Sequence, residues 1–190
     1  VGMQSIVGRG DILRKINFPK YIVVLSAMTS SLISLSINLV VVFIFALFTG
    51  VKFTAWVLLL PLNIAQLFIL AFGIALFLST LYVKFRDIGH IWEVVLQVLF
   101  YAMPVMYPIT QVANVKILGI EAQKIMMLNP IAQTIQDIRH NLISPSTVPT
   151  VWSIEGNIWI SLIPIALTAI AFIIGLTYFR KNSKKFAEIL

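Results

Sequence analysis

Four long segments of the chain contain no charged side chain, and these segments restrict what it can fold into. They cover residues 21–51, 53–83, 94–115 and 156–179, and are 31, 31, 22 and 24 residues long. About 20 apolar residues in a helix cross a hydrocarbon core roughly 30 Å thick, so each segment can span a bilayer. Backbone in lipid must satisfy its own hydrogen bonds, which leaves helices or closed barrels. The segments lack the apolar–polar alternation of barrel strands, so the sequence predicts a helical membrane protein.

The composition agrees with this prediction. Hydrophobic residues make up 59% of the 190 residues and charged residues 11%, whereas soluble domains are about 25% charged. We therefore expect an all-α integral membrane protein that forms one transmembrane domain. Its four predicted spans are 21–48, 54–83, 91–110 and 156–179. The absence of cysteine excludes disulfides and thiolate metal sites within this chain.

The basic residues indicate how the spans are oriented. Ten of the 14 Lys and Arg residues lie in alternate connecting segments, namely 1–20, the turn with Lys84 and Arg86, and the tail 180–190. The long connection 116–155 also carries acidic residues and is close to neutral. By the positive-inside rule, both ends of the chain are predicted to be cytoplasmic. Because the basic residues follow the topology, we expect no nucleic-acid partner.

The N-terminal part contains two features outside the predicted spans. The apolar start 1–7 is typical of the last turns of an earlier span, with a flexible N-terminus as the alternative. The segment DILRKINFPK, residues 11–20, predicts a short amphipathic helix that Asp11 caps and Pro19 ends. Its basic residues favour the cytoplasmic side. It is interpreted either as an interfacial helix on anionic lipid or as a docking helix for a cytoplasmic partner.

Polar residues recur inside the first two spans. Four of them repeat every fourth residue in the first span: Ser26, Ser30, Ser34 and Asn38. Small hydroxyl residues on one face permit close helix packing, and the same stripe is compatible with a hydrated path. The hydroxyls can also bond to carbonyls of the preceding turn. In the second span, Asn63 and Gln66 lie three residues apart and predict a polar pair that faces the helix bundle.

The third span starts with charged residues and ends with two prolines. The residues predicted at its cytoplasmic mouth are Arg86, Asp87, His90 and Glu93. His90 and Glu93 share a helix face and predict an ion pair, whereas a metal site would need further ligands. At the other end, Pro104 and Pro108 break the helix in the outer leaflet, where Tyr101 and Tyr107 lie at interface depth.

The outer segment 116–143 is too apolar for an ordinary loop and too short for two spans. It predicts two half-helices, about 121–128 and 131–142, separated at Asn129–Pro130. A re-entrant segment of this kind persists only where it is buried in protein or lines a cavity. The alternative is a pair of amphipathic helices lying flat on the outer surface.

The sequence contains no motif of an enzyme. It lacks a phosphate-binding glycine-rich loop, a Ser/His/Asp set and paired catalytic carboxylates. We therefore expect that the chain is not an enzyme and does not use ATP by itself.

Four stretches occur in order along the chain: DILRKINFPK from residue 11, YVKFRDIGHIWEVVLQVLFYAMPVMYP from residue 82, NPIAQTIQDIRHNLI from residue 129 and YFRKNSKKFAEIL from residue 178. Their order and content resemble the permease subunit of type-2 ABC exporters, in the branch that exports lipid-linked polysaccharides and teichoic acids in bacteria. The resemblance covers nearly the whole chain.

The resemblance implies a larger assembly. Such permeases have six spans, with two re-entrant half-helices on the outer side before the last span, so this chain would lack an N-terminal helix and the first span or two. They work as a homodimer above two ATPase subunits, which bind ATP and Mg²⁺, so no cofactor is expected on this chain. The implied substrate is a lipid-linked glycan or a polyol-phosphate polymer that crosses the bacterial inner membrane. A drug or lipid efflux permease of the same superfamily is the alternative.

The resemblance also implies roles for particular residues. The segment that matches the ATPase-docking helix consists of Asp11, Ile12, Leu13, Arg14, Lys15, Ile16, Asn17, Phe18 and Pro19. The residues assigned to the channel or exit gate are Tyr101, Pro104, Tyr107, Pro108, Asn129 and Pro130. At the cytoplasmic mouth, Arg86 is a candidate contact for a pyrophosphate group, with a solvated topology anchor as the alternative.

Overall fold

The computed structural model describes residues 2–9, 19–51, 53–117, 119–143, 146–183 and 186. Eight of the nine residues predicted to dock an ATPase, 11–18, lie outside these ranges. Within the described part, three helical segments are long and apolar enough to cross a membrane, at Tyr21–Phe48, Ala55–Lys84 and Ile158–Asn182. The prediction of an all-α membrane protein is confirmed.

Four helices correspond to the predicted spans. The first is α2, Tyr21–Phe48. The second span starts with the 3₁₀ helix η2, Ala55–Leu59, and continues as α3, Leu60–Lys84. The last contains α8, Ile158–Ser161, and α9, Ile163–Asn182.

The third predicted span is the shortest helix of the four. It forms α4, Ile88–Ala102, of 15 residues, which ends two residues before Pro104 instead of reaching residue 110. A proline lacks the N–H that a continuing helix needs, so the chain turns here. The number of spans therefore stays a prediction.

Short elements complete the described chain: η1 Val7–Arg9, η3 Ile109–Val112, β1 Lys116–Ile117, β2 Ile120–Glu121, α5 Ala122–Met127, α6 Pro130–Leu142 and α7 Val151–Glu155. The two strands pair antiparallel, with Lys116 opposite Glu121. Gly119 adopts φ +83° in the turn between them, a left-handed conformation that glycine enters without steric cost. Helices α5 and α6 are separated by Leu128 and Asn129, next to the predicted break. Re-entry of this pair into the membrane stays a prediction.

The chain divides into two compact units. Unit 1 draws on residues 1–41, 68–95 and 169–190, and unit 2 on 42–67 and 96–168. Because the boundaries fall inside α2, α3, α4 and α9, each of these helices contributes to both units.

Unit 1 contains the larger apolar core. Its fully buried members include Ile6, Val24 and Leu76, and Phe179 is 2% exposed. These residues come from the N-terminal segment, α2, α3 and α9, so three long helices and the chain start share one core. Two lysine side chains reach α9 and the residue after it: the Lys20 Nζ donates to the Ser183 carbonyl at 2.6 Å, and the Lys84 Nζ to Asn182 Oδ1 at 3.0 Å.

In unit 1, α3 and α9 approach each other at two glycines. A Cβ atom on Gly175 would lie 2.0 Å from the carbonyl oxygen of Gly73, and one on Gly73 would lie 2.5 Å from the Cα of Phe172. These distances leave no room for any side chain. Small residues at a helix crossing allow this backbone approach in a membrane protein.

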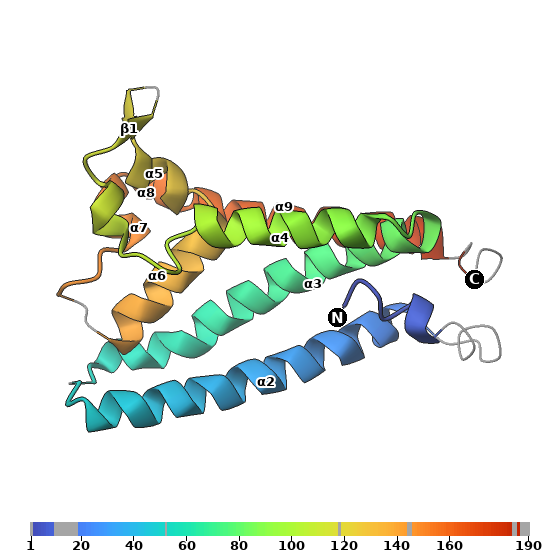
Figure 1. Cartoon of the computed structure of the whole chain (residues 1–190), viewed down its shortest axis with the longest axis horizontal. Helices are drawn as coiled ribbons and strands as arrows, with labels where there is room; N and C mark the ends of the chain where they lie inside the picture. Colours follow the sequence, from blue (N-terminus) through green and yellow to red (C-terminus); the bar gives the residue numbers. More distant parts are fainter. Residues whose placement is uncertain are drawn as a thin grey trace. The chain divides into compact units, whose positions relative to one another are not determined.

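The core of unit 2 gathers the short elements. Ile109, Met127 and Val151, from η3, α5 and α7, are completely buried against one another. Helices α5, α7 and α8 lie together (Figure 1). Met127 lies three residues before α6, so this cluster holds the chain next to the start of that helix.

The polar stripe of α2 satisfies its hydroxyl groups within the helix. The Ser30 Oγ donates to the Ser26 carbonyl at 3.1 Å and the Ser34 Oγ to the Ser30 carbonyl at 3.2 Å. Both side chains and Asn38 are exposed in the single chain. The structure thus shows the bonding to preceding carbonyls, and it leaves helix packing and a hydrated path as predictions.

Candidate functional site

Two of the residues predicted for the exit gate, Asn129 and Pro130, form the start of α6. The side chain of Asn129 caps α6, because its Oδ1 accepts a hydrogen bond from the Ile131 N–H at 3.0 Å. Pro130 occupies the first helical position, where its missing N–H costs nothing. The Asn–Pro pair therefore ends the preceding turn and starts α6 with a fixed direction.

The buried face of α6 is mostly polar. We call the following residues the α6 polar face: Gln133, Thr134, Gln136, Asp137 and Asn141, all buried. Polar side chains are rarely buried without partners, because an unpaired buried group costs about 1–3 kcal/mol. The partners of this face therefore show what α6 is attached to.

A row of side-chain hydrogen bonds attaches α6 to the first turns of α3. The Gln66 Nε2 donates to Gln133 Oε1 at 2.7 Å, and the Gln133 Nε2 donates to Asp137 Oδ2. Asn63, one turn before Gln66 on α3, is 7% exposed. The predicted polar pair of the second span does face other helices, so that prediction is confirmed.

Two atoms at this contact are buried without a hydrogen-bond partner in the described part of the chain. They are Nδ2 of Asn63, a donor, and Oδ1 of Asp137, an acceptor. Burial raises the pKa of Asp137 to about 6, although the hydrogen bond from Gln133 and the charge of His140 oppose this shift. Helix α6 is not one of the three helical segments of spanning length. The Asp137 carboxyl group therefore gains its negative charge as the pH rises past about 6.

Arg139 attaches α6 to the break after α4. Its Nη1 donates to the carbonyl oxygen of Pro104 at 2.6 Å, and its Nη2 donates to that of Val105 at 2.5 Å. In a continuing helix, the Pro104 carbonyl would accept from the N–H of residue 108, which is a proline and has none. Arg139 therefore supplies a donor that the second proline removes.

The C-terminal end of α6 has two further contacts. The His140 Nδ1–H donates to the Val148 carbonyl at 2.6 Å. The same ring meets Trp56 edge-on, with 5.9 Å between the ring centroids. Helix α6 thus contacts η2 at one end and the start of α3 further along.

The other predicted gate residues differ in how far they are exposed to solvent. Tyr101 is 75% exposed and Pro108 is exposed, whereas Pro104 is fully buried. The Tyr107 hydroxyl lies 3.5 Å from the Tyr101 carbonyl oxygen. Their role in a channel stays a prediction, and Asn129 and Pro130 have the structural role described above.

The predicted cytoplasmic mouth is a solvent-exposed group in unit 1. Arg86 and Asp87 are exposed just before α4. His90 Nδ1 lies 3.9 Å from Glu93 Oε2, with 88% and 68% of the two side chains exposed. The two side chains lie within ion-pair distance of each other, and exposure at this level makes the contact weak. The predicted ion pair stays a prediction.

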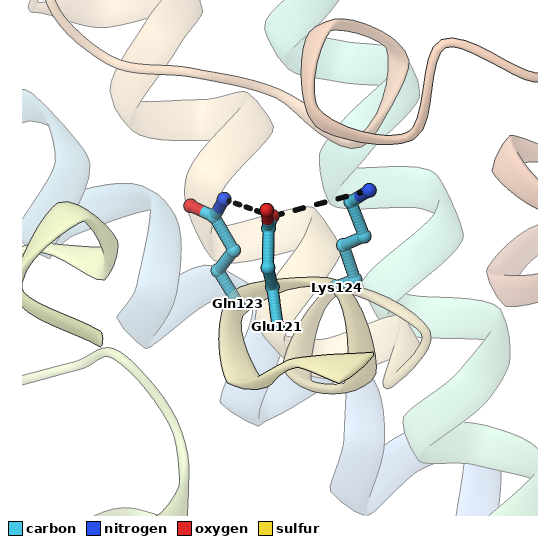
Figure 2. A network of polar contacts seen from close by, with 3 residues as sticks. All are labelled: Glu121, Gln123 and Lys124. Carbon is cyan, nitrogen blue, oxygen red and sulfur yellow. Dashed lines mark hydrogen bonds and ion pairs between the residues drawn. The ribbon is translucent and has the colours of Figure 1, made fainter. Parts of the chain in front are cut away.

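A second polar group lies at the start of α5. The Gln123 Nε2 donates to Glu121 Oε2 at 2.9 Å, and the Lys124 Nζ lies 3.9 Å from the same oxygen (Figure 2). All three residues belong to one short turn. The hydrogen bond and the ion pair of this group therefore stay within the local turn.

The sequence interpretation missed Arg139, Gln133 and Asp137. One available signal was the spacing of Pro104 and Pro108, which leaves a carbonyl without a helical donor. The other was the recurrence of polar residues at 133, 136, 137 and 141, which places them on one face of a helix. Within the described residues, no group of three or more His, Cys, Asp or Glu is arranged to hold a metal ion.

Comparison with known proteins gives a consistent result. Residues 2–143 match the family model described as ABC-2 type transporter. The chain is 28% and 25% identical to two proteins of Klebsiella pneumoniae named O-antigen export system permease protein RfbA, over 98% of this chain and 66% of each relative. A Myxococcus xanthus protein of the same name is 27% identical over 60% of this chain and 44% of its own length.

The chain spans less than two thirds of the length of these relatives. The family match, however, covers most of the chain and includes α2, α3, α4 and α6. The chain, with its long apolar helices and the polar face of α6, therefore belongs to the ABC-2 type transporter family.

Proposed function

We propose that the chain is the transmembrane permease subunit of an ATP-driven ABC exporter, and that its cargo is a lipid-linked polysaccharide of the O-antigen type. The observation that carries this proposal is the similarity, along 98% of the chain, to proteins named O-antigen export system permease. That name favours a polysaccharide over a drug or a membrane lipid. A teichoic acid or another polyol-phosphate polymer is the alternative polymer.

The proposed assembly consists of two copies of this permease and two ATPase subunits, in the bacterial inner membrane with both ends of this chain in the cytoplasm. ATP and Mg²⁺ bind to the ATPase subunits. Residues 11–19 form the docking surface for the ATPase. Closure of the ATPase subunits on ATP pushes this segment and shifts the permease towards its open state, because ATP binds one state better than the other.

The exposed side chains suit this cargo in two places. Arg86 lies exposed beside α4, where a guanidinium group can pair with the pyrophosphate of a lipid carrier. Tyr101, 75% exposed near the end of α4, offers an aromatic face on which the C–H surface of a sugar can stack.

The test is the amount of lipid-linked polymer on each side of the inner membrane after depletion of the full-length protein. The expected result is accumulation of one lipid-linked glycan in the inner leaflet and its loss from the cell surface. Normal surface polymer without accumulation would contradict the proposal and favour drug or lipid efflux.

The control uses complementation of the depleted cells. The unaltered protein is expected to restore surface polymer. A variant in which a flexible linker replaces residues 11–19 is expected to insert into the membrane but to restore nothing, because it cannot dock the ATPase. Full restoration by this linker variant would contradict the proposed docking surface, while the proposed cargo would still stand.

A further inference from the structure

Helix α6 is attached on two sides by different polar contacts. Gln133 and Asp137 are four residues apart and share the face that meets Gln66 of α3. Arg139 follows Asp137 by two residues, which in a helix of 3.6 residues per turn places it roughly 160° away. Helix α6 therefore lies between the start of α3 and the turn that follows α4.

From this arrangement we propose that Arg139 is a positioning residue, which ties the turn after α4 to α6 and so carries a movement of α4 to the outer segment. The inference rests on the proposed function, since it assigns to this contact the step that connects the spans to the outer segment during export. Arg139 itself need not touch the cargo.

The bonds of Arg139 are suited to this role. Pro104 is fully buried, so its carbonyl has no access to water, and Pro108 removes its helical donor. The guanidinium group reaches two successive carbonyls through its two terminal nitrogens, at 2.6 and 2.5 Å. A planar fork with two donors fixes distance and direction together, whereas the single ammonium group of a lysine fixes only distance.

The Arg139 side chain also contacts a residue of its own helix, α6. The Nη1 of Arg139 lies 3.4 Å from Gln136 Oε1, a residue that is 2% exposed. The guanidinium group is therefore oriented before it meets the turn. With the row from Gln66 to Asp137 on the other side, α6 has little freedom to move independently of α3 and the turn.

The experiment measures the distance between α4 and the end of α6 in the full-length protein with its ATPase partner. Residues 1–190 contain no cysteine, and any cysteine elsewhere in the full-length protein is first replaced by serine. Spin labels are then attached to Val98→Cys and Ile143→Cys, at residues that are 61% and 47% exposed. The pair is examined in the parent, in Arg139→Met and in Arg139→Lys, with and without ATP. Lys124→Met is the matched control, because it removes a basic residue of the same segment whose ion pair is with Glu121 of its own turn.

In Arg139→Met we expect a distance distribution at least twice as broad as in the parent, without the change that ATP produces in the parent. Export of polymer is expected to fall at least tenfold, while ATP hydrolysis stays within twofold of the parent. Arg139→Lys should lie between the two, and Lys124→Met should match the parent. Loss of coupling with retained hydrolysis separates a positioning role from a general loss of folding.

An unchanged distance distribution and ATP response in Arg139→Met would overturn the inference. If the Arg139→Met protein does not accumulate in cells, Arg139→Lys is the deciding variant. A distance distribution in Arg139→Lys equal to that of the parent would then overturn the inference. If the parent exports no polysaccharide, the proposed function fails, and the distance distributions still decide whether Arg139 ties α4 to α6.

Discussion

At Gly73 and Gly175, a single methyl group decides whether two helices can meet. The atoms that an added Cβ would meet at 2.0–2.5 Å belong to the backbone of the facing helix. Backbone atoms cannot rotate away as a side chain can, so the helices themselves must separate. The apolar core that α3 and α9 share in unit 1 depends on this approach.

Gly175→Ala is therefore expected to destabilise the protein by about 1–3 kcal/mol, the usual cost of overpacking. For a chain of this size, this corresponds to a decrease in melting temperature of roughly 5 °C, measured on the purified full-length protein. Gly8→Ala is the control, because a Cβ there meets nothing within 4 Å. Equal melting temperatures for Gly175→Ala and Gly8→Ala would show that the two helices do not meet at these glycines.

Asp137 makes stability depend on pH. Its pKa in the folded chain is raised by burial from 3.8 to about 6, so between these values the folded chain binds more protons than the unfolded one. The free energy of unfolding is therefore expected to fall as the pH rises from about 4 to about 6, by up to about 3 kcal/mol. Above pH 6 the contribution of this group stays constant.

Asp137→Asn tests this dependence, because an amide keeps an acceptor for Gln133 and carries no charge. We expect this variant to be more stable than the parent at pH 7.5 and equally stable at pH 4. Thermal unfolding at each pH is the measurement. Asp137→Leu is the control, since it removes the charge and the acceptor together and should gain less. If the stability of Asp137→Asn depended on pH in the same way as that of the parent, the raised pKa of Asp137 would be contradicted.

The start of α6 depends on one side chain. The bond from the Ile131 N–H to Asn129 Oδ1 at 3.0 Å satisfies a donor that the helix leaves free. Asn129→Ala is expected to cost about 1 kcal/mol, and Asn129→Asp should retain most of the stability. Thermal unfolding and hydrogen exchange at the first turn of α6 are the measurements, and equal protection in the Ala variant would contradict the cap.

The sequence predicts these elements to different degrees, for physical reasons. The limits of α2 and of the segment from η2 to α3 follow closely from apolar length, because the bilayer sets that length. The break at Asn129–Pro130 follows from the capping side chain of Asn129 and the missing N–H of Pro130, which the sequence shows directly. The contacts of Arg139, of Gln133 with Gln66, and of Gly73 with Gly175 depend on which helices become neighbours. Each polar or small residue has several possible partners in one sequence, and only the fold selects among them.

The number of membrane crossings determines on which side of the membrane each end of the chain lies. The described chain has three helical segments of spanning length, and an odd number of crossings would place its two ends on opposite sides. Both ends are cytoplasmic, as the basic residues predict, only if α4 also crosses. A helix of 15 residues is about 22 Å long, shorter than a hydrocarbon core of roughly 30 Å, so the turn after it would have to complete the crossing.

Single cysteines at Phe85, Lys116 and Lys181 decide this point, since all three side chains are exposed. In cells without an outer barrier, a membrane-impermeant maleimide is expected to label position 116 of the full-length protein, and positions 85 and 181 only after lysis. The protein without an introduced cysteine gives the background. Labelling of 85 and 116 from the same side would mean that α4 returns without crossing. The turn held by Arg139 would then lie on the side where α4 begins, and α6 could not belong to an outer gate.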